Sequence, residues 1–174
     1  MIRFDFNPQK FANVVAYIAQ HKKPVTKKEL CKLIFFADQA HLLQYGRTIT
    51  GDYYCALAQG PIPSCGLDML NGKSHTPKAN LDIMNGVGRL QGYRFVPVKG
   101  ADLKVFSRSD LKILNAVLAK FGGMNADQLE QLSHDELAWK KTKQSKTMDF
   151  DLFFEGHPEA SLMRETVNAE HSDS

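Results

Sequence analysis

The densest apolar stretch of the chain lies between residues 30 and 43, where Leu, Ile and Phe occupy every side of a predicted helix. A helix that is apolar all round must be enclosed by protein. Thr26 and Glu29 have the spacing of a capping box before it, and Gly46 can close it in the left-handed conformation. We therefore expect a central buried helix that ends near Gln44, and its few polar groups need partners.

Most of the remaining apolar pattern is also helical. Residues 11–18 place Phe, Val and Ile at the i, i+3, i+4 and i+7 spacing of a one-sided helix, and residues 111–121 repeat a similar pattern. Residues 150–154 add a last apolar segment. The predicted helices follow residues that favour N-cap positions, namely Asn7, Ser107 or Ser109, Asn125 and Ser133.

Short extended segments complete the fold. Residues 53–58, 93–98 and 103–106 are rich in β-forming side chains, and we expect them to pair in one small sheet. Gly60-Pro61 is interpreted either as a binding loop or as a turn that ends a strand, because Pro lacks the N–H that a ladder needs. The predicted fold class is α+β and mainly α-helical, with a compact helical domain around the central helix and a small antiparallel β-sheet.

We expect one domain over residues 1–157. Within it, residues 71–92 mix Gly, Asn, Ser and Lys with few apolar side chains, which predicts a mobile excursion. Residues 158–174 are predicted to be an acidic, disordered tail. Seven acids against one base give residues 147–174 a charge of −6, so the total of +3 leaves +9 on residues 1–146. One hypothesis is that the tail folds back over this basic body and competes with an acidic partner.

The cysteines and the distribution of charged residues indicate the cellular compartment. The three cysteines, Cys31, Cys55 and Cys65, are an odd number without metal-ligand spacing, which indicates reduced thiols in a cytoplasmic protein. Charged residues interrupt the first ten positions, so we expect no signal peptide. No segment reaches the roughly 20 apolar residues of a membrane span. No nucleotide-binding glycine motif or nucleophile elbow occurs, and no cofactor is indicated.

Two groups of residues could carry chemistry. Asp38 and His41 share one face of the central helix and could act as acid and base or hold a metal, or they could satisfy buried polar groups. His134 and Glu136 form a second acid–imidazole pair, but Ser133 to Glu136 also reads as a capping box. Trp139 is interpreted as a packing anchor.

At this point the order and spacing of several short motifs resemble the Panacea domain family. The resemblance covers roughly residues 11–141. Its central part runs through the apolar helix to Gly60-Pro61, and its second part ends at Trp139-Lys140. The matching positions include Lys32, His41, Gly46, Asp52, Gly60, Pro61, His134, Glu136 and Trp139.

The resemblance implies a non-enzymatic, SocA-like antitoxin, of a family that also includes proteins described as phage-associated. Such a protein would neutralise a cognate toxin by binding it, and one branch resembles adaptors that deliver the toxin to a cytosolic AAA+ protease. Aromatic and charged residues around the exit of the central helix are then candidates for the contact surface. These residues are Phe35, Phe36, Tyr45, Arg47, Tyr53 and Tyr54.

Two alternatives remain beside the toxin-binding hypothesis. The first is a metal-dependent or acid–base enzyme, which requires Asp38, His41, His134 and Glu136 to converge in one pocket. The second is a DNA-binding regulator that uses the basic body. The acids of the would-be recognition helix after Asn125 disfavour it, because phosphate repels carboxylates.

Overall fold

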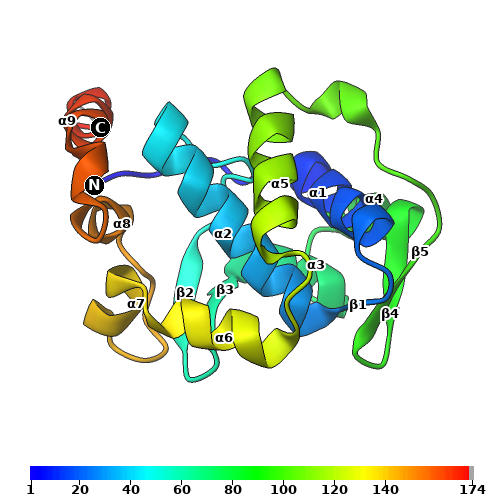
Figure 1. Cartoon of the computed structure of the whole chain (residues 1–174). Helices are drawn as coiled ribbons and strands as arrows, with labels where there is room; N and C mark the ends of the chain where they lie inside the picture. The colour runs from blue at the N-terminus through cyan, green and yellow to red at the C-terminus, as the bar shows by residue number, and fades with distance from the viewer. Residues whose placement is uncertain (173–174) are drawn as a thin grey trace.

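The buried central helix is confirmed. In a computed structural model, which describes residues 1–172, the 19-residue helix α2 (Lys27–Tyr45) crosses the middle of the molecule (Figure 1). Leu30, Leu33, Ile34 and Phe35 on this helix have no exposed side-chain surface. Its apolar residues therefore form the centre of the hydrophobic core, and the rest of the chain packs around them.

Helices surround α2 on several sides. Helices α1, α5 and α6 pack against it, and α8 and α9 contact it near its C-terminal end, on the side where both chain termini lie (Figure 1). This arrangement explains why α2 has apolar residues around most of its circumference, whereas a helix covered on one side needs only an apolar stripe. The helical elements are α1 (Pro8–His21), α3 (Ser64–Asn71), α4 (Lys78–Val87), η1 (Leu103–Val105), α5 (Arg108–Phe121), α6 (Ala126–His134), α7 (Leu137–Lys141), α8 (Phe150–Glu155), η2 (Pro158–Ala160) and α9 (Ser161–Glu170).

The strands are paired differently from the prediction. Strand β2 (Tyr54–Leu57) pairs with β3 (Gly60–Pro63) in a two-stranded antiparallel hairpin. A separate sheet has the order β1 (Val25–Thr26), β5 (Arg94–Pro97), β4 (Gly88–Gln91). Residues 103–106, predicted as a strand, contain η1 instead. The single predicted sheet is wrong because each of the strands β2 and β4 pairs with the strand that follows it after a two-residue turn.

Helix caps follow the sequence closely, with one exception. Asn7, Thr26, Ser107 and Asn125 all accept a hydrogen bond from the backbone N–H three residues later. The capping box predicted from Ser133 to Glu136 is wrong. Ser133 lies in the last turn of α6, its hydroxyl donates to the carbonyl of Glu130, and the Glu136 side chain makes no cap.

Two segments outside the predicted helices and strands contain regular structure. Residues 71–92 contain α4 and β4, because Met84 and Val87 are buried and α4 packs against α1. Residues 161–170 form α9, whose Val167 is fully buried close to Gly46 at the end of α2. The prediction of a disordered tail is wrong for this helix, and residues 173–174 lie outside the described part of the chain.

The observed fold confirms a mainly helical α+β domain. None of the helices within residues 1–172 has both the length and the apolar character that a membrane crossing requires.

We predict that Val167→Ala lowers the free energy of unfolding by about 1–2 kcal/mol, because it removes buried methyl groups and leaves a cavity beneath α9. Thr166→Ala on the exposed side of the same helix is the control and should change stability by less than about 0.5 kcal/mol. Urea unfolding of both variants measures the difference. Equal stability of the two variants would show that α9 does not dock as described.

Candidate functional site: a groove beside the central helix

Asp38 fastens the chain that leaves α2. Its carboxylate is fully buried and accepts hydrogen bonds from the backbone N–H groups of Ile49 and Thr50 at 2.8 and 3.0 Å. The hydroxyls of Thr50 and Tyr54 donate to it at 2.5 and 2.7 Å. Burial raises the pKa of Asp38, and these donors oppose that rise. With four donors in place, the carboxylate holds a loop to the helix, and it has no free side for a substrate.

Asp52 has a comparable role one step further along the chain. It accepts from the backbone N–H groups of Cys65 and Gly66 at 3.0 and 2.7 Å, and so caps the first turn of α3 from outside the helix. Burial raises the pKa of Asp52 to about 6, although these hydrogen bonds act in the opposite direction. Asp52 therefore positions α3 relative to strand β2.

His41 and Arg47 join α2 to α5. The Nδ1 of His41 donates to the carbonyl of Arg47 at 2.7 Å, and its Nε2 lies 2.9 Å from the hydroxyl of Ser109. Burial lowers the pKa of His41, so the ring is neutral near pH 7 and its Nε2 accepts from Ser109.

The Arg47 guanidinium and the Lys10 ammonium pair with the buried Asp110 at 2.9 and 2.7 Å. Burial alone would raise the pKa of Asp110, but the hydrogen bond from Lys10 and the other partners hold it below its usual range. These groups tie α1, α2 and α5 together.

His134, Glu136 and Trp139 connect the end of α6 and the start of α7 to strand β2 and to α2. The indole N–H of Trp139 donates to the carbonyl of Leu57 at 2.9 Å, and the His134 ring stacks on the indole with 4.1 Å between centroids. Glu136 accepts from Gln39 at 2.8 Å and from His157 at 3.2 Å. Burial acts to raise the pKa of Glu136, but these two donors bring it below its usual value. Glu136 thus links α2 to the chain before α9.

The four groups of the enzyme hypothesis have separate partners. Within residues 1–172, no hydrogen bond joins any two of Asp38, His41, His134 and Glu136. In the same part of the chain, no set of three or more His, Cys, Asp and Glu side chains is arranged to hold a metal ion. Their arrangement corresponds to structural hydrogen bonding at several places, and they do not share one pocket.

The predicted aromatic contact surface divides into two parts. Phe35, Phe36 and Tyr54 are core residues, so they are not among the candidates that reach the surface. Tyr45 and Tyr53 are exposed by 37% and 45% and remain available on the surface. Spacing along the chain could not separate the two sets, because packing against distant elements decides which rings are covered. Phe35 contacts Tyr54 of β2 and Phe153 of α8, and Phe36 stacks on Phe121 of α5.

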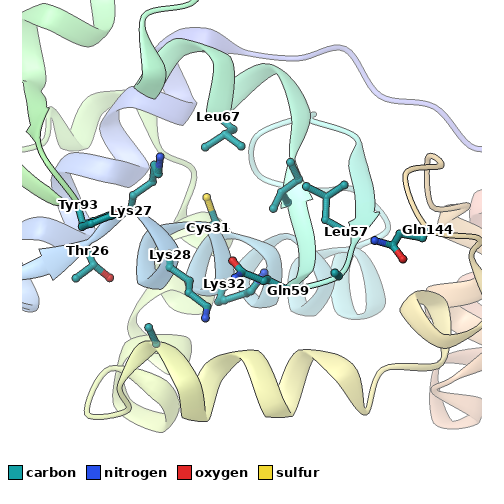
Figure 2. A pocket seen from close by; sticks show the side chains of 13 residues that line it. Thr26, Lys27, Lys28, Cys31, Lys32, Leu57, Gln59, Leu67, Tyr93 and Gln144 are labelled. Carbon is teal, nitrogen blue, oxygen red and sulfur yellow. The ribbon is translucent and has the colours of Figure 1, made fainter.

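A groove of about 790 Å³ lies beside the N-terminal half of α2. Figure 2 shows α2 between the β2–β3 hairpin, α3 and α6, with Leu67 approaching from α3 and Lys28 pointing toward α6. Leu57, Ile62, Leu67 and Ala126 give the groove apolar walls. Polar groups of α2 line it as well, chiefly Lys27, Lys28 and Lys32.

Lys32 is the buried cation of this groove. Only 1% of the residue is exposed, and its ammonium donates to the carbonyl of Pro61 at 2.9 Å. Gly60 makes this contact possible. Its φ is +99°, and a Cβ atom there would lie 2.9 Å from the ammonium nitrogen and 2.4 Å from the Ser133 hydroxyl. Burial lowers the pKa of Lys32 to about 8.

Comparison with known protein families matches residues 30–140 to one family, described as antitoxin SocA-like, Panacea domain. The chain belongs to this family. The match includes the hairpin, α3, α6 and most of α2, and therefore most of the groove. Membership gives the protein an antitoxin-like role in general terms. No curated protein and no solved structure matched the chain.

Gly60, Pro61 and Lys32 form one unit in this Panacea domain, although the sequence points to them separately. A lysine inside a helix that is apolar all round was the available signal for Lys32, because such a charge needs a partner or a purpose. The apolar walls gave no signal of their own. Leu57, Ile62 and Leu67 come from two strands and a helix whose packing is set by distant contacts.

We predict that Asp38→Ala lowers the free energy of unfolding by about 3–5 kcal/mol, since it leaves four buried donors without an acceptor. Asp82→Ala, at an exposed carboxylate of α4, should change stability by less than about 0.5 kcal/mol. Thermal and urea unfolding measure both variants. If Asp38→Ala is as stable as the wild type, the structural role of Asp38 is contradicted and a chemical role is the alternative.

Lys32 should give the protein a distinct dependence of stability on pH. Its pKa is about 8 in the folded chain against 10.5 for a free side chain, so the unfolded chain binds more protons between these values. Between pH 8 and pH 10.5, the free energy of unfolding of the wild type should rise by up to about 3 kcal/mol relative to that of Lys32→Met. The variant lacks this titrating group and therefore lacks its contribution to the pH dependence.

Cys31 lowers the free energy of unfolding as the pH rises through the upper part of the same range, because burial raises the pKa of its thiol to about 11. The quantity to measure is therefore the difference in urea stability between wild type and Lys32→Met at pH 7, 8, 9 and 10. A difference that does not vary with pH contradicts a buried ammonium.

Proposed function

We propose that this protein is an antitoxin that neutralises its cognate toxin by direct binding, and that the groove beside α2 is the docking site. The observation that carries the proposal is the contrast between the groove and the other candidate groups. Asp38, His41 and Glu136 are engaged in bonds that hold the fold, whereas the groove is open, mostly apolar and largely within the family match. Such a surface is suited to binding another protein.

The position of the tail supports the same surface. Helix α9 packs at the C-terminal end of α2, near Gly46, and the groove lies beside the N-terminal half of that helix. The acidic tail of the described structure therefore does not line the groove. Its earlier interpretation as a competitor for an acidic partner has no support from this placement.

Ala58 provides a direct test of the docking site. It is exposed in the turn between β2 and β3 and lines the groove, so Ala58→Trp fills the entrance without removing a core contact. Ala169→Trp is the matched control, because it adds the same side chain to an exposed position of α9.

We expect the cognate toxin to be the product of the gene next to the one that encodes this chain. Each variant is produced in bacteria together with that product, and rescue of growth is measured. We expect wild type and Ala169→Trp to restore growth and to co-purify with that product. Ala58→Trp should lower affinity by about tenfold or more, because the indole blocks the entrance of the groove in which the partner docks. Unfolding curves check that all three proteins are folded. If wild type neither rescues growth nor binds, the function is wrong. If Ala58→Trp behaves as wild type, the docking site is elsewhere.

A further inference from the structure

The starting point is the incomplete set of partners around Lys32. An ammonium group has three donors, and the structure gives this one a single acceptor, the carbonyl of Pro61. Within residues 1–172, Lys32 forms no ion pair. Asp38 on the same helix is also fully buried but has four donors. Lys32 is thus a buried charge with bonding capacity left, and it faces a groove.

The nearby acids do not supply the missing partner. Glu130 on α6 pairs with Lys28 at 3.0 Å, and Asp127 lies 3.6 Å from the same ammonium. Glu130 is close enough to favour the charged form of Lys32, yet burial still lowers the pKa of Lys32 to about 8. At pH 7 the group is mostly protonated. The groove therefore presents a positive charge at its inner end, beside Gln59 of the hairpin turn (Figure 2).

The strand that borders the groove limits how a peptide can bind. Strand β3 contains Pro61 and Pro63, which have no N–H, and the Pro61 carbonyl already accepts from Lys32. An added strand would find few free backbone groups along this edge. Binding must depend on side chains, with apolar groups against Leu57, Ile62 and Leu67 and a negative group at the ammonium.

We propose that the groove binds a segment of the toxin in which a carboxylate, flanked by apolar side chains, pairs with the ammonium of Lys32. This inference rests on the proposed function and names the chemistry of its binding site. A carboxylate would supply the acceptors that Lys32 lacks, in a place where little water competes, so the charge-assisted hydrogen bond is strong. The partner segment is recognised by one acid in an apolar context.

The probe is a library of random twelve-residue peptides displayed on phage. The library is selected on the full-length protein at pH 7 and counter-selected on Ala58→Trp, so that the surviving peptides depend on the groove. We expect the survivors to share an Asp or Glu next to apolar residues. One survivor is then synthesised together with the counterpart that carries the corresponding amide, and calorimetry measures both affinities.

The acidic peptide should bind wild type roughly 10- to 100-fold more tightly than its amide counterpart, the range for a hydrogen bond to a charged group. In Lys32→Met this preference should disappear. Lys112→Met, which removes an exposed positive charge on α5, should retain it and controls for net charge. Circular dichroism and urea unfolding establish that each variant is folded.

Several results would overturn the inference. They are survivors that are neutral or basic, a preference that persists in Lys32→Met, and a library that yields no groove-dependent peptide. Displacement of the peptide by a twelve-nucleotide single strand would mean that the site binds phosphate instead. Growth rescue separates the levels of failure. If Ala58→Trp loses rescue and Lys32→Met keeps it, the groove docks the toxin without the carboxylate. If the chain rescues nothing, the proposed function fails first.

Discussion

The enclosure of α2 is the constraint on which the rest of the structure depends. A helix covered on all sides can keep a polar side chain only where the surrounding chain provides a partner. Asp38 meets this condition through the loop after α2, His41 through the Arg47 carbonyl and Ser109, and Gln39 through Glu136. Each of these bonds fixes a different segment against the helix. The polar positions of α2 therefore determine where the loop, α5 and α7 are placed, while the apolar positions supply most of the burial.

The sequence predicted those features whose causes are local. The N-caps at Thr26 and Asn125, and the left-handed Gly46, depend on residues within one helical turn, and all of them are present. Of the two serines predicted for the third cap, Ser107 is the one that caps α5. The predicted pairing of the strands was wrong, because the side-chain pattern of a strand is compatible with several pairing partners. The segments 71–92 and 161–170 were misjudged for a related reason. Each has few apolar residues, but the ones it has, such as Val167, are buried against distant elements.

The candidate site was predicted only in part. The resemblance marked Lys32, Gly60 and Pro61, but only the folded chain shows that the glycine allows the ammonium to reach the proline carbonyl. Glu136 illustrates the opposite error. Its spacing from Ser133 satisfies the rule for a capping box, yet its carboxylate is engaged with Gln39 and His157. A local rule is reliable where no tertiary partner competes, and a buried acid near two donors is where such competition is strongest.

Asp38 and Lys32 show how one helix can serve both stability and recognition. Both are buried ionisable groups. Burial raises the pKa of Asp38 and lowers that of Lys32, so in each case it favours the neutral form. At Asp38, four donors compensate for that burial. At Lys32, a single carbonyl does so, and the fold keeps a charge that lowers its own stability near neutral pH. Buried charges that destabilise a fold are characteristic of binding and catalytic sites, because a bound partner can form the hydrogen bonds and ion pairs that the free protein lacks there. The loss of stability caused by burying Lys32 is thus the physical reason to place the recognition site at the groove. Asp38, which the sequence analysis considered first, has all its hydrogen-bond donors in place and gives no such reason.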